Sequence, residues 1–282
     1  MRRSPLARAP RSSPGRARRS GARRRGAVVA SVLVALGGCA ARPGLGPDAV
    51  RTPVEVGEAP WRSLGLVATE VGGRCTGVLV GPRTVLTAGH CVFHPRLARP
   101  VDPRTVHFFL GMTARGHAGH ARAVSFVLKP DFALAPGPRP LPTTAADGDW
   151  ALLALDRELG ATDRVIPLLR GLAAPGTALA FGGYQADRPR VMVADLSCAV
   201  AGYARVPAGR LMMRHSCAAT SGASGGPLLA RAPNGGWVVV GIGSLAKNGK
   251  SGGWAVPTAA VVQHGTDAAA AAPEAGAAAA AR

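Results

Sequence analysis

Aromatic side chains and lysines are scarce in this 282-residue chain. Phe, Trp and Tyr make up 4% of the sequence, and of 34 basic residues only Lys129, Lys247 and Lys250 are lysines. With 15 acidic residues the formal charge is +19, which by itself suggests a polyanionic partner. A nucleic-acid-binding surface, however, needs a basic helix or a set of stacking aromatic rings. Neither is visible in the sequence, so we expect no nucleic-acid partner.

The positive charge is unevenly distributed. Residues 1–25 hold ten arginines and no acidic residue, and in the rest of the chain basic residues exceed acidic ones by only 9. The basic residues are nearly all arginine, and Ala, Gly and Pro are abundant beside them. This composition indicates a coding bias rather than a surface built to bind polyanions.

The chain also lacks a long apolar segment. The longest candidate, residues 26–38, falls short of the about 20 apolar residues that span a bilayer, but after an arginine-rich start it is typical of a signal peptide. It ends in Leu-Gly-Gly-Cys, which resembles the bacterial lipobox, where the cysteine becomes the first mature residue and carries lipid. We expect a signal peptide over 1–38, a lipid anchor on Cys39 and a linker over 39–49.

On this interpretation the protein is exported to the bacterial cell envelope and held at the membrane by the anchor. The alternative is an ordinary signal peptide cut after Ala41, which would leave the protein periplasmic or secreted; a misassigned start codon would then explain the long basic segment.

Five cysteines are an odd number for an exported chain, and an acylated Cys39 would explain the odd one. The remaining four allow three pairings. Cys75 with Cys91 and Cys198 with Cys217 are the local pairs, each closing a loop that contributes about 3 kcal/mol in the chain-entropy model. Four unpaired thiols would not fit an oxidising compartment.

Short apolar runs broken by Gly and Pro continue from about residue 50 to 262. Such spacing predicts an all-β sandwich or barrel, and no long amphipathic helical pattern interrupts it. The candidate strands form two groups of six, which divide near residue 160. They are 64–69, 75–80, 83–86, 105–110, 121–128 and 150–155, then 178–181, 191–200, 210–214, 227–230, 237–242 and 253–256.

Two segments are not expected to join these strands. Residues 135–142 are rich in proline and predict a surface loop leading towards Asp149. Residues 267–282 are nearly all alanine with no amphipathic face, so we expect a disordered tail after a folded domain over 50–266.

Three short segments carry the residues of a Ser, His, Asp relay, in which a base held by a third group activates a hydroxyl. His90 precedes Cys91, so a disulfide to Cys75 would hold this base on a short rigid loop. Asp149 precedes an apolar run and would lie at the mouth of a buried strand, where a carboxylate can orient an imidazole. Asp147 is a nearby alternative, but no apolar strand follows it directly.

Ser224 lies in a glycine-rich turn, residues 222–226, whose backbone can come close to a substrate. An acyl-transfer site needs N–H groups that stabilise a developing oxyanion. The amides of Gly222 and Ser224, two residues apart, are the natural donors.

In this order the three segments resemble the trypsin/chymotrypsin-like serine protease family. Thr-Ala-Gly-His-Cys at 87–91, Asp-Trp-Ala-Leu-Leu at 149–153 and Gly-Ala-Ser-Gly-Gly-Pro at 222–227 correspond to its His, Asp and Ser motifs, with Ala223 the one change. The chain is most similar to the bacterial, glutamyl-endopeptidase-like branch. There a cysteine often lies seven residues before the serine, as Cys217 does, and an Ala-Val-Pro stretch, here 255–257, follows the last strands.

The resemblance covers roughly residues 50–262 and implies two six-stranded antiparallel β-barrels with the active site between them. It also implies a Cys75–Cys91 disulfide beside the histidine. By the same resemblance Ser224 attacks the scissile carbonyl, His90 takes its proton, Asp149 orients His90, and the amides of Gly222 and Ser224 hold the oxyanion. The implied activity is that of a serine endopeptidase acting on protein or peptide substrates without a cofactor, and we expect a monomer.

The family's activation switch is missing. In its zymogen-activated branch an acidic residue directly before the serine receives a newly cut N-terminal ammonium, and here that residue is Ala223. The Ile-Val-Gly-Gly start is also absent, with Val-Glu-Val-Gly at 54–57 in the corresponding region, and a lipid-modified Cys39 could not insert. We therefore predict no activation by N-terminal insertion.

Substrate preference follows from the predicted primary pocket. Its base should lie near Ala218 and Ala219 and one wall near residues 244–246, with no carboxylate to pair a Lys or Arg side chain. The histidine that glutamyl endopeptidases use is replaced by Gly243. We therefore expect a small or medium apolar side chain before the cleaved bond.

The remaining histidines carry no predicted chemistry. His117 and His120 have the spacing of a metal pair, but no third ligand is evident nearby, so we expect no metal site. The other four are interpreted as surface or core residues: His94, His107, His215 and His264. The competing function is a catalytically inactive protein-binding module on a protease scaffold, since fold does not ensure function.

Overall fold

The computed structural model describes residues 42–94, 96–129, 132–135, 141–142, 148–205 and 211–263. Their first half forms a closed antiparallel barrel in the order β2-β3-β4-β9-β6-β5. Its strands are β2 (Leu64–Thr69), β3 (Arg74–Gly81), β4 (Thr84–Thr87), β5 (Val106–Leu110), β6 (Gly119–Leu128) and β9 (Ala151–Leu155). Buried and partly exposed residues alternate along β5 and β9, the pattern of strands that turn one face to a core.

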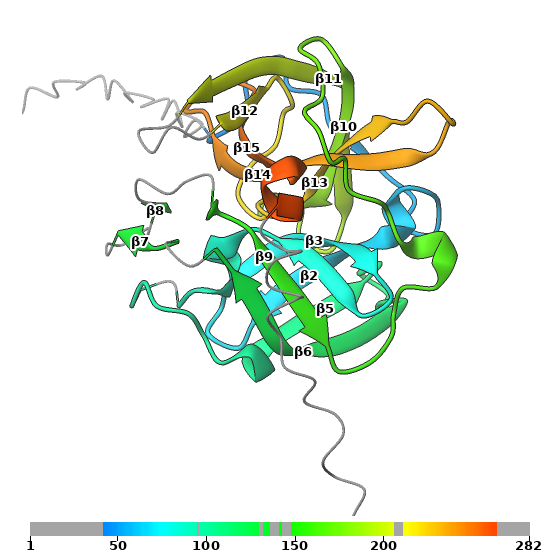
Figure 1. The fold of residues 1–282 in the computed structure, drawn as a ribbon, viewed down its shortest axis with the longest axis vertical. Helices are drawn as coiled ribbons and strands as arrows, with labels where there is room; N and C mark the ends of the chain where they lie inside the picture. The colour runs from blue at the N-terminus through cyan, green and yellow to red at the C-terminus, as the bar shows by residue number, and fades with distance from the viewer. Residues whose placement is uncertain are drawn as a thin grey trace, which may run out of the picture. The chain divides into compact units, whose positions relative to one another are not determined.

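The second half forms a seven-stranded antiparallel sheet in the order β1-β11-β10-β13-β14-β15-β12. Because β11 also pairs with β12, six of the strands close into a second barrel and β1 is added at its edge. The strands are β1 (Thr52–Pro53), β10 (Ala178–Tyr184), β11 (Met192–Arg205), β12 (Leu211–His215), β13 (Pro227–Arg231), β14 (Trp237–Ala246) and β15 (Gly253–Pro257). In Figure 1 the strands labelled β10 to β15 lie together above β2, β3, β5, β6 and β9.

The predicted fold class, two six-stranded antiparallel barrels, is confirmed, and each of the twelve predicted strands overlaps an observed one. Several strands run past their predicted ends because ladder pairing, rather than apolar sequence, sets the boundary. β11 continues to Arg205, opposite Leu211 of β12, and β14 continues to Ala246, opposite Gly253 of β15.

Elements outside the barrels are short. A two-stranded sheet pairs β7 (Leu134–Ala135) with β8 (Leu141–Pro142), and 3₁₀ turns occur at η1 (Trp61–Ser63), η2 (Gly89–Val92), η3 (Pro103–Thr105) and η5 (Thr162–Arg164). Residues 258–263 are helical, which the sequence analysis did not predict, because so few residues show no helical period. No helix in the described part of the chain is long and apolar enough to cross a membrane.

Hydrogen bonds tie the two barrels together beside β3. The Thr76 N–H donates to the carbonyl oxygen of Ser224 at 2.8 Å, and the Thr76 hydroxyl donates to that of Gly222 at 2.9 Å. The same hydroxyl accepts the Tyr184 N–H of β10 at 2.9 Å. One residue of the first barrel therefore fixes the loop that carries Ser224.

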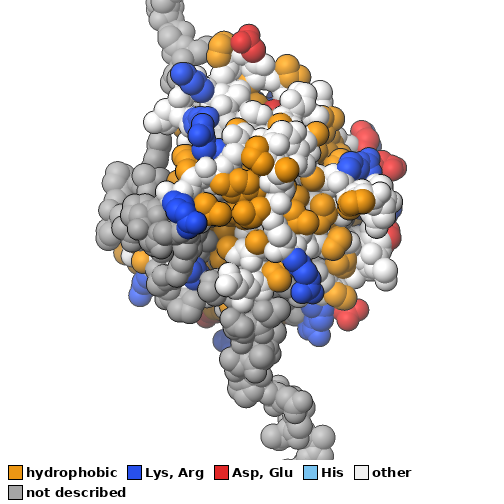
Figure 2. Space-filling view, turned by 45° about the horizontal axis from the view of Figure 1, so that its top comes forward, with side chains coloured by type: hydrophobic (Ala, Val, Ile, Leu, Met, Phe, Trp, Pro, Cys, Tyr) orange, Lys and Arg blue, Asp and Glu red, His pale blue; other side chains and the backbone are white. Residues whose placement is uncertain are grey.

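The surface in view in Figure 2 shows hydrophobic side chains gathered near its centre, with Lys and Arg side chains standing apart from one another around them. Among the residues described, the most exposed large hydrophobic ones include Val50, Leu196 and Val124. Several predictions lie outside the described residues: the signal peptide, Cys39, Ala41, Asp147, His264 and the tail over 267–282.

Candidate active site

His90 lies where the first barrel faces the loop that carries Ser224. It belongs to the 3₁₀ turn η2, three residues after the end of β4, and its side chain is 22% exposed. The next residue, Cys91, is bonded to Cys75 on β3, with the two Cα atoms 6.0 Å apart. The short turn and the disulfide together hold the imidazole in place, as the sequence predicted.

Asp149 reaches His90 because of the register between β4 and β9. Thr87, the last residue of β4, pairs with Ala151, the first of β9, so His90, which follows β4, and Asp149, which precedes β9, lie at the same end of this antiparallel pair. The carboxylate is fully buried and its two oxygens lie 2.8 and 3.0 Å from Nδ1 of His90. It also accepts the His90 backbone N–H at 2.8 Å. These contacts fix both the position and the ring orientation of His90.

The pKa values of His90 and Asp149 are both shifted from their ordinary values. Burial lowers the pKa of His90, but the charge and the hydrogen bond of Asp149 outweigh it, so the pKa stands above the ordinary histidine value. Burial likewise raises the pKa of Asp149, and His90 and Ser244 together bring it below its ordinary value. Asp149 therefore stays ionised, Nδ1 of His90 keeps its proton, and Nε2 is left to act as a base.

Ser244 is a second partner of Asp149 that the sequence analysis missed. Its hydroxyl, 9% exposed on β14, donates a short hydrogen bond to the carboxylate oxygen that also faces His90. The sequence analysis had assigned this residue only to the pocket wall. No local signal could have revealed the contact, because 95 residues separate the two side chains.

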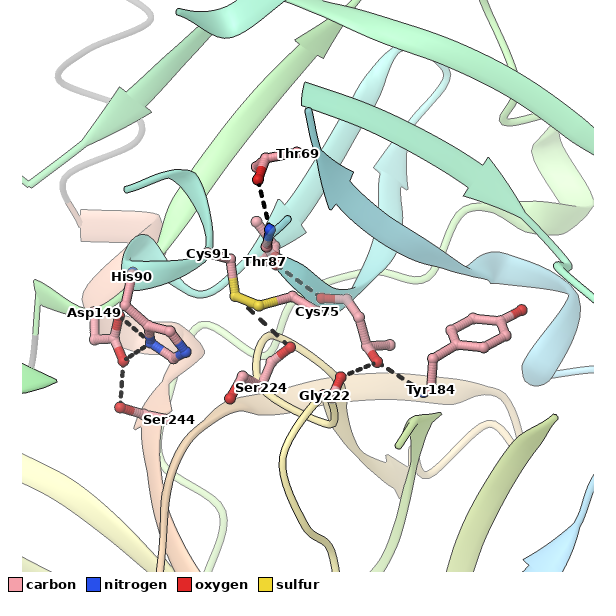
Figure 3. The surroundings of a disulfide bond; sticks show 12 residues. Thr69, Cys75, Thr87, His90, Cys91, Asp149, Tyr184, Gly222, Ser224 and Ser244 are labelled. Atoms are coloured by element: carbon pink, nitrogen blue, oxygen red, sulfur yellow. Dashed lines mark hydrogen bonds and ion pairs between the residues drawn. A yellow bond between two sulfur atoms is a disulfide. The ribbon is translucent and has the colours of Figure 1, made fainter. Parts of the chain in front are cut away.

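Figure 3 shows the imidazole of His90 lying between the carboxylate of Asp149 and the side chain of Ser224. His90 and Ser224 line the same cavity. Within the described residues no hydrogen bond joins the Ser224 hydroxyl to the His90 ring, and such contacts are commonly long before a substrate is bound. The structure thus brings His90, Asp149 and Ser224 together at one site.

The turn before Ser224 has the backbone geometry that an oxyanion site needs. The Ala223 N–H donates to the Thr220 carbonyl at 3.0 Å and Gly222 has φ +93°, which is a type II turn with glycine in its third position. A side chain at Gly222 would also meet the Tyr184 carbonyl oxygen, only 2.4 Å from the position of its Cβ. Glycine is therefore required here for both conformation and space.

The orientation of the Ser221–Gly222 peptide is fixed as well. The Ser221 carbonyl oxygen accepts the Ala186 N–H at 2.8 Å, and in a planar trans peptide the Gly222 N–H points the opposite way. Among the described residues, the N–H groups of Gly222 and Ser224 have no acceptor. Both are therefore available to a developing oxyanion.

A cavity of about 550 Å³ opens beside Ser224. Its lining includes Ala219 and the 244–246 wall, as predicted, together with Phe181, Gly243 and His215. Ala218, also predicted near the base, is buried and is not part of the lining. His215, interpreted from sequence as a surface or core residue, is 3% exposed, and its Nδ1 is buried with no hydrogen-bond partner within the described residues. Burial, and secondarily the nearby charge of Lys247, lowers its pKa to about 4, so the ring is uncharged at neutral pH.

The other histidines fall into structural settings. His94 accepts two backbone N–H groups in its own turn. Nδ1 of His107 lies 2.9 Å from Nε2 of His120. His107 is thus a third histidine beside His117 and His120, and sequence spacing could not reveal it because it comes from the neighbouring strand. In the described residues, the only three side chains with ligand atoms close enough together to hold a metal ion are Cys75, His90 and Cys91. Both of these sulfurs are in a disulfide.

The second local cysteine pair also forms. Cys198 on β11 is bonded to Cys217, two residues beyond the end of β12, so both disulfides follow the local pairing among the three that the sequence allowed. Cys217 also lies directly before Ala218 and Ala219 of the predicted pocket base. This disulfide therefore fixes the segment that leads into the Ser224 loop.

Comparison with known proteins agrees with this geometry. No curated protein sequence matches the chain. A solved structure of a Glu endopeptidase in complex with MPD matches with a TM-score of 0.63 and 21% sequence identity, over 80% of this chain and 99% of that one, a likeness of fold. The model of the Trypsin family matches residues 50–263. The chain therefore belongs to the trypsin family of serine peptidases.

Proposed function

We propose that the protein is an exported serine endopeptidase that hydrolyses peptide bonds through an acyl-enzyme on Ser224. The observation that carries this proposal is the His90 ring, held on Nδ1 by the buried Asp149 and lining one cavity with Ser224. A scaffold used only for binding would gain nothing from a buried ionised carboxylate, which costs free energy to desolvate.

In this mechanism Ser224 Oγ attacks the scissile carbonyl carbon while Nε2 of His90 takes the hydroxyl proton. The carbonyl oxygen becomes negative and accepts hydrogen bonds from the N–H groups of Gly222 and Ser224. The imidazolium, stabilised by Asp149, then gives its proton to the amine nitrogen as the C–N bond breaks, which leaves the acyl group on Ser224 Oγ. A water molecule, deprotonated by the same ring, attacks the acyl carbon; the bond to Oγ breaks, the ring returns the proton to Oγ, and the carboxylic acid product is released.

The cavity beside Ser224 supports a preference for uncharged, apolar side chains. Phe181, Ala219 and Leu245 line it, and no carboxylate of the described residues does. His215 is uncharged at neutral pH, since its pKa is lowered to about 4. A Lys or Arg side chain would therefore lie in the cavity without a partner for its charge, a situation that costs several kcal/mol.

Cleavage of a peptide library by the purified mature chain tests activity and specificity together. At pH 8 we expect cleavage after small and medium apolar residues, at least about 100-fold faster in kcat/KM than after Lys or Arg, because each 1.4 kcal/mol of unpaired charge costs tenfold. Preferred cleavage after Lys or Arg would refute this assignment of the pocket.

Export is part of the same proposal. Two disulfides within one domain are typical of an oxidising compartment, and the Arg-rich start with its apolar run is typical of a signal peptide. A lipid on Cys39 would hold the enzyme at the cell envelope, with protein or peptide substrates as its partners.

We further propose that no N-terminal cleavage activates the enzyme. Ala223 is 3% exposed and offers no charge, and the Val54 N–H already donates to the Met192 carbonyl at 3.1 Å. An active-site phosphonate should therefore titrate the mature chain to full occupancy before any cleavage near Arg51. Activity that appears only after such a cleavage would contradict this, and a sample cut there by an added protease is the comparison.

A further inference from the structure

The oxyanion turn is held from behind by the segment that follows β10. Residues 185–187, which we call the support loop, contact the turn through two hydrogen bonds. The Ala186 N–H donates to the Ser221 carbonyl at 2.8 Å, and the Gln185 side-chain oxygen accepts the Thr220 N–H at 2.9 Å. If the support loop moved, the Ser221–Gly222 peptide would lose the contact that sets its orientation.

The support loop is in turn fixed by Arg51, the residue just before β1. Its guanidinium donates to both carboxylate oxygens of Asp187, at 3.1 and 2.7 Å, and to the side-chain oxygen of Gln185 at 2.5 Å. The side chains of Arg51 and Asp187 are 9% and 6% exposed, and Gln185 is 1% exposed. A forked, nearly buried contact of this kind is strong and geometrically specific.

Arg51 cannot move away freely, because its own segment is part of the second barrel. Thr52 and Pro53 pair with Ala194 and Val193 of β11. A continuous path of contacts thus runs from the N-terminal segment through Arg51 to the support loop, and from there to the peptide that presents the Gly222 N–H.

We propose that Arg51 is a positioning residue for catalysis: through Asp187 and Gln185 it holds the oxyanion turn in its active form without any cleavage of the chain. A guanidinium is permanently charged, unlike an N-terminal ammonium that must be created by proteolysis. The anion lies on the support loop, at Asp187, instead of directly before Ser224. This inference rests on the proposed peptidase function and explains how the turn is ordered beside the uncharged Ala223.

The alternative role for Arg51 is purely structural, as an ion pair that stabilises the fold. The two roles differ in what their loss changes. If Arg51 only stabilises the fold, its removal lowers the amount of folded enzyme and its melting temperature, but each folded site keeps its kcat. Loss of positioning lowers kcat per site with little change in KM, because the oxyanion contact exists only in the transition state.

The test compares Arg51→Met and Arg51→Lys with wild type, using a peptide amide with an apolar residue before the scissile bond. Active sites are counted with a fluorophosphonate. We expect kcat per titrated site to fall about 10- to 100-fold in Arg51→Met, below the 10²–10³ lost when an oxyanion donor is removed outright. Arg51→Lys keeps the charge but loses the forked contact, so its kcat per titrated site should lie between those of wild type and Arg51→Met. A peptide aldehyde, whose bound oxygen uses the same N–H groups, should bind more weakly by a similar factor.

Arg42→Met is the matched control. Arg42 donates to the same Asp187 carboxylate at 3.0 Å, but it is 60% exposed and no contact to Gln185 is found for it among the described residues. Exposed pairs contribute at most about 1 kcal/mol, so its kcat should stay within about twofold of wild type.

Wild-type kcat per titrated site in Arg51→Met would overturn the inference, as would a loss confined to melting temperature and folded fraction. A wild-type chain that neither hydrolyses peptides nor reacts with the fluorophosphonate would overturn the proposed function and this inference with it. A reactive wild type with an unaffected Arg51→Met would overturn the inference alone.

Discussion

Ser224→Ala is expected to abolish covalent labelling of the chain by a fluorophosphonate and to lower kcat by about 10⁴–10⁶-fold, the range seen when the nucleophile of a serine peptidase is removed. In the proposed mechanism this hydroxyl forms the acyl-enzyme, and its removal leaves His90 without the nucleophile that it activates. What activity remains would come from the oxyanion donors and from substrate binding. Labelling is measured on the intact protein by mass spectrometry, and kcat on a peptide amide.

Ser221→Ala is the control for this experiment. Ser221 lies three residues earlier in the same turn and lines the same cavity, but its fixed group is the backbone carbonyl, which the substitution keeps. It should label at close to the wild-type rate. A wild-type chain that does not label while its melting curve shows a folded protein would favour the inactive binding module over the peptidase.

Much of the fold could be predicted because short apolar runs and turn residues carry local information. The apolar runs predicted strands at 105–110 and 150–155, and the structure has β5 (Val106–Leu110) and β9 (Ala151–Leu155) there, with buried and partly exposed residues alternating along each. Strand ends were less predictable. The last residues of β11 and β14 are held by partners on β12 and β15, and such pairing leaves no trace in the local sequence.

The active site, like the fold, has parts that local sequence predicts and parts that only contacts between distant residues determine. His90, Asp149 and Ser224 stand in recognisable segments, and the structure brings the three together. The positions of Ser244, His215 and Arg51 could not be assigned from sequence, because each lies beside residues that are distant in the chain. Arg51, for example, reaches Gln185 and Asp187 across 134 and 136 residues. Ala223 showed that the usual activation contact is missing, but only the structure shows which residues support the turn instead.

Asp149→Asn is expected to lower kcat/KM by roughly 10³–10⁴-fold, because an amide no longer fixes the imidazole tautomer or stabilises the imidazolium. The pH profile should change as well. In wild type Asp149 raises the pKa of His90 above its ordinary value, so activity should rise with pH through a pKa above 6.5 as the ring loses its proton. Without the carboxylate charge, burial alone lowers that pKa, so the acid limb of the residual activity should move to lower pH.

The measurement is kcat/KM from pH 5 to 9 for both proteins, with melting temperatures to show that the variant is folded. Asp163→Asn provides the control, since that carboxylate is 55% exposed and pairs with Arg62 on the surface. Its profile should overlay the wild-type one. An Asp149→Asn profile with an unmoved acid limb would show that another group sets the protonation of His90. Retention of wild-type activity would remove Asp149 from the relay altogether.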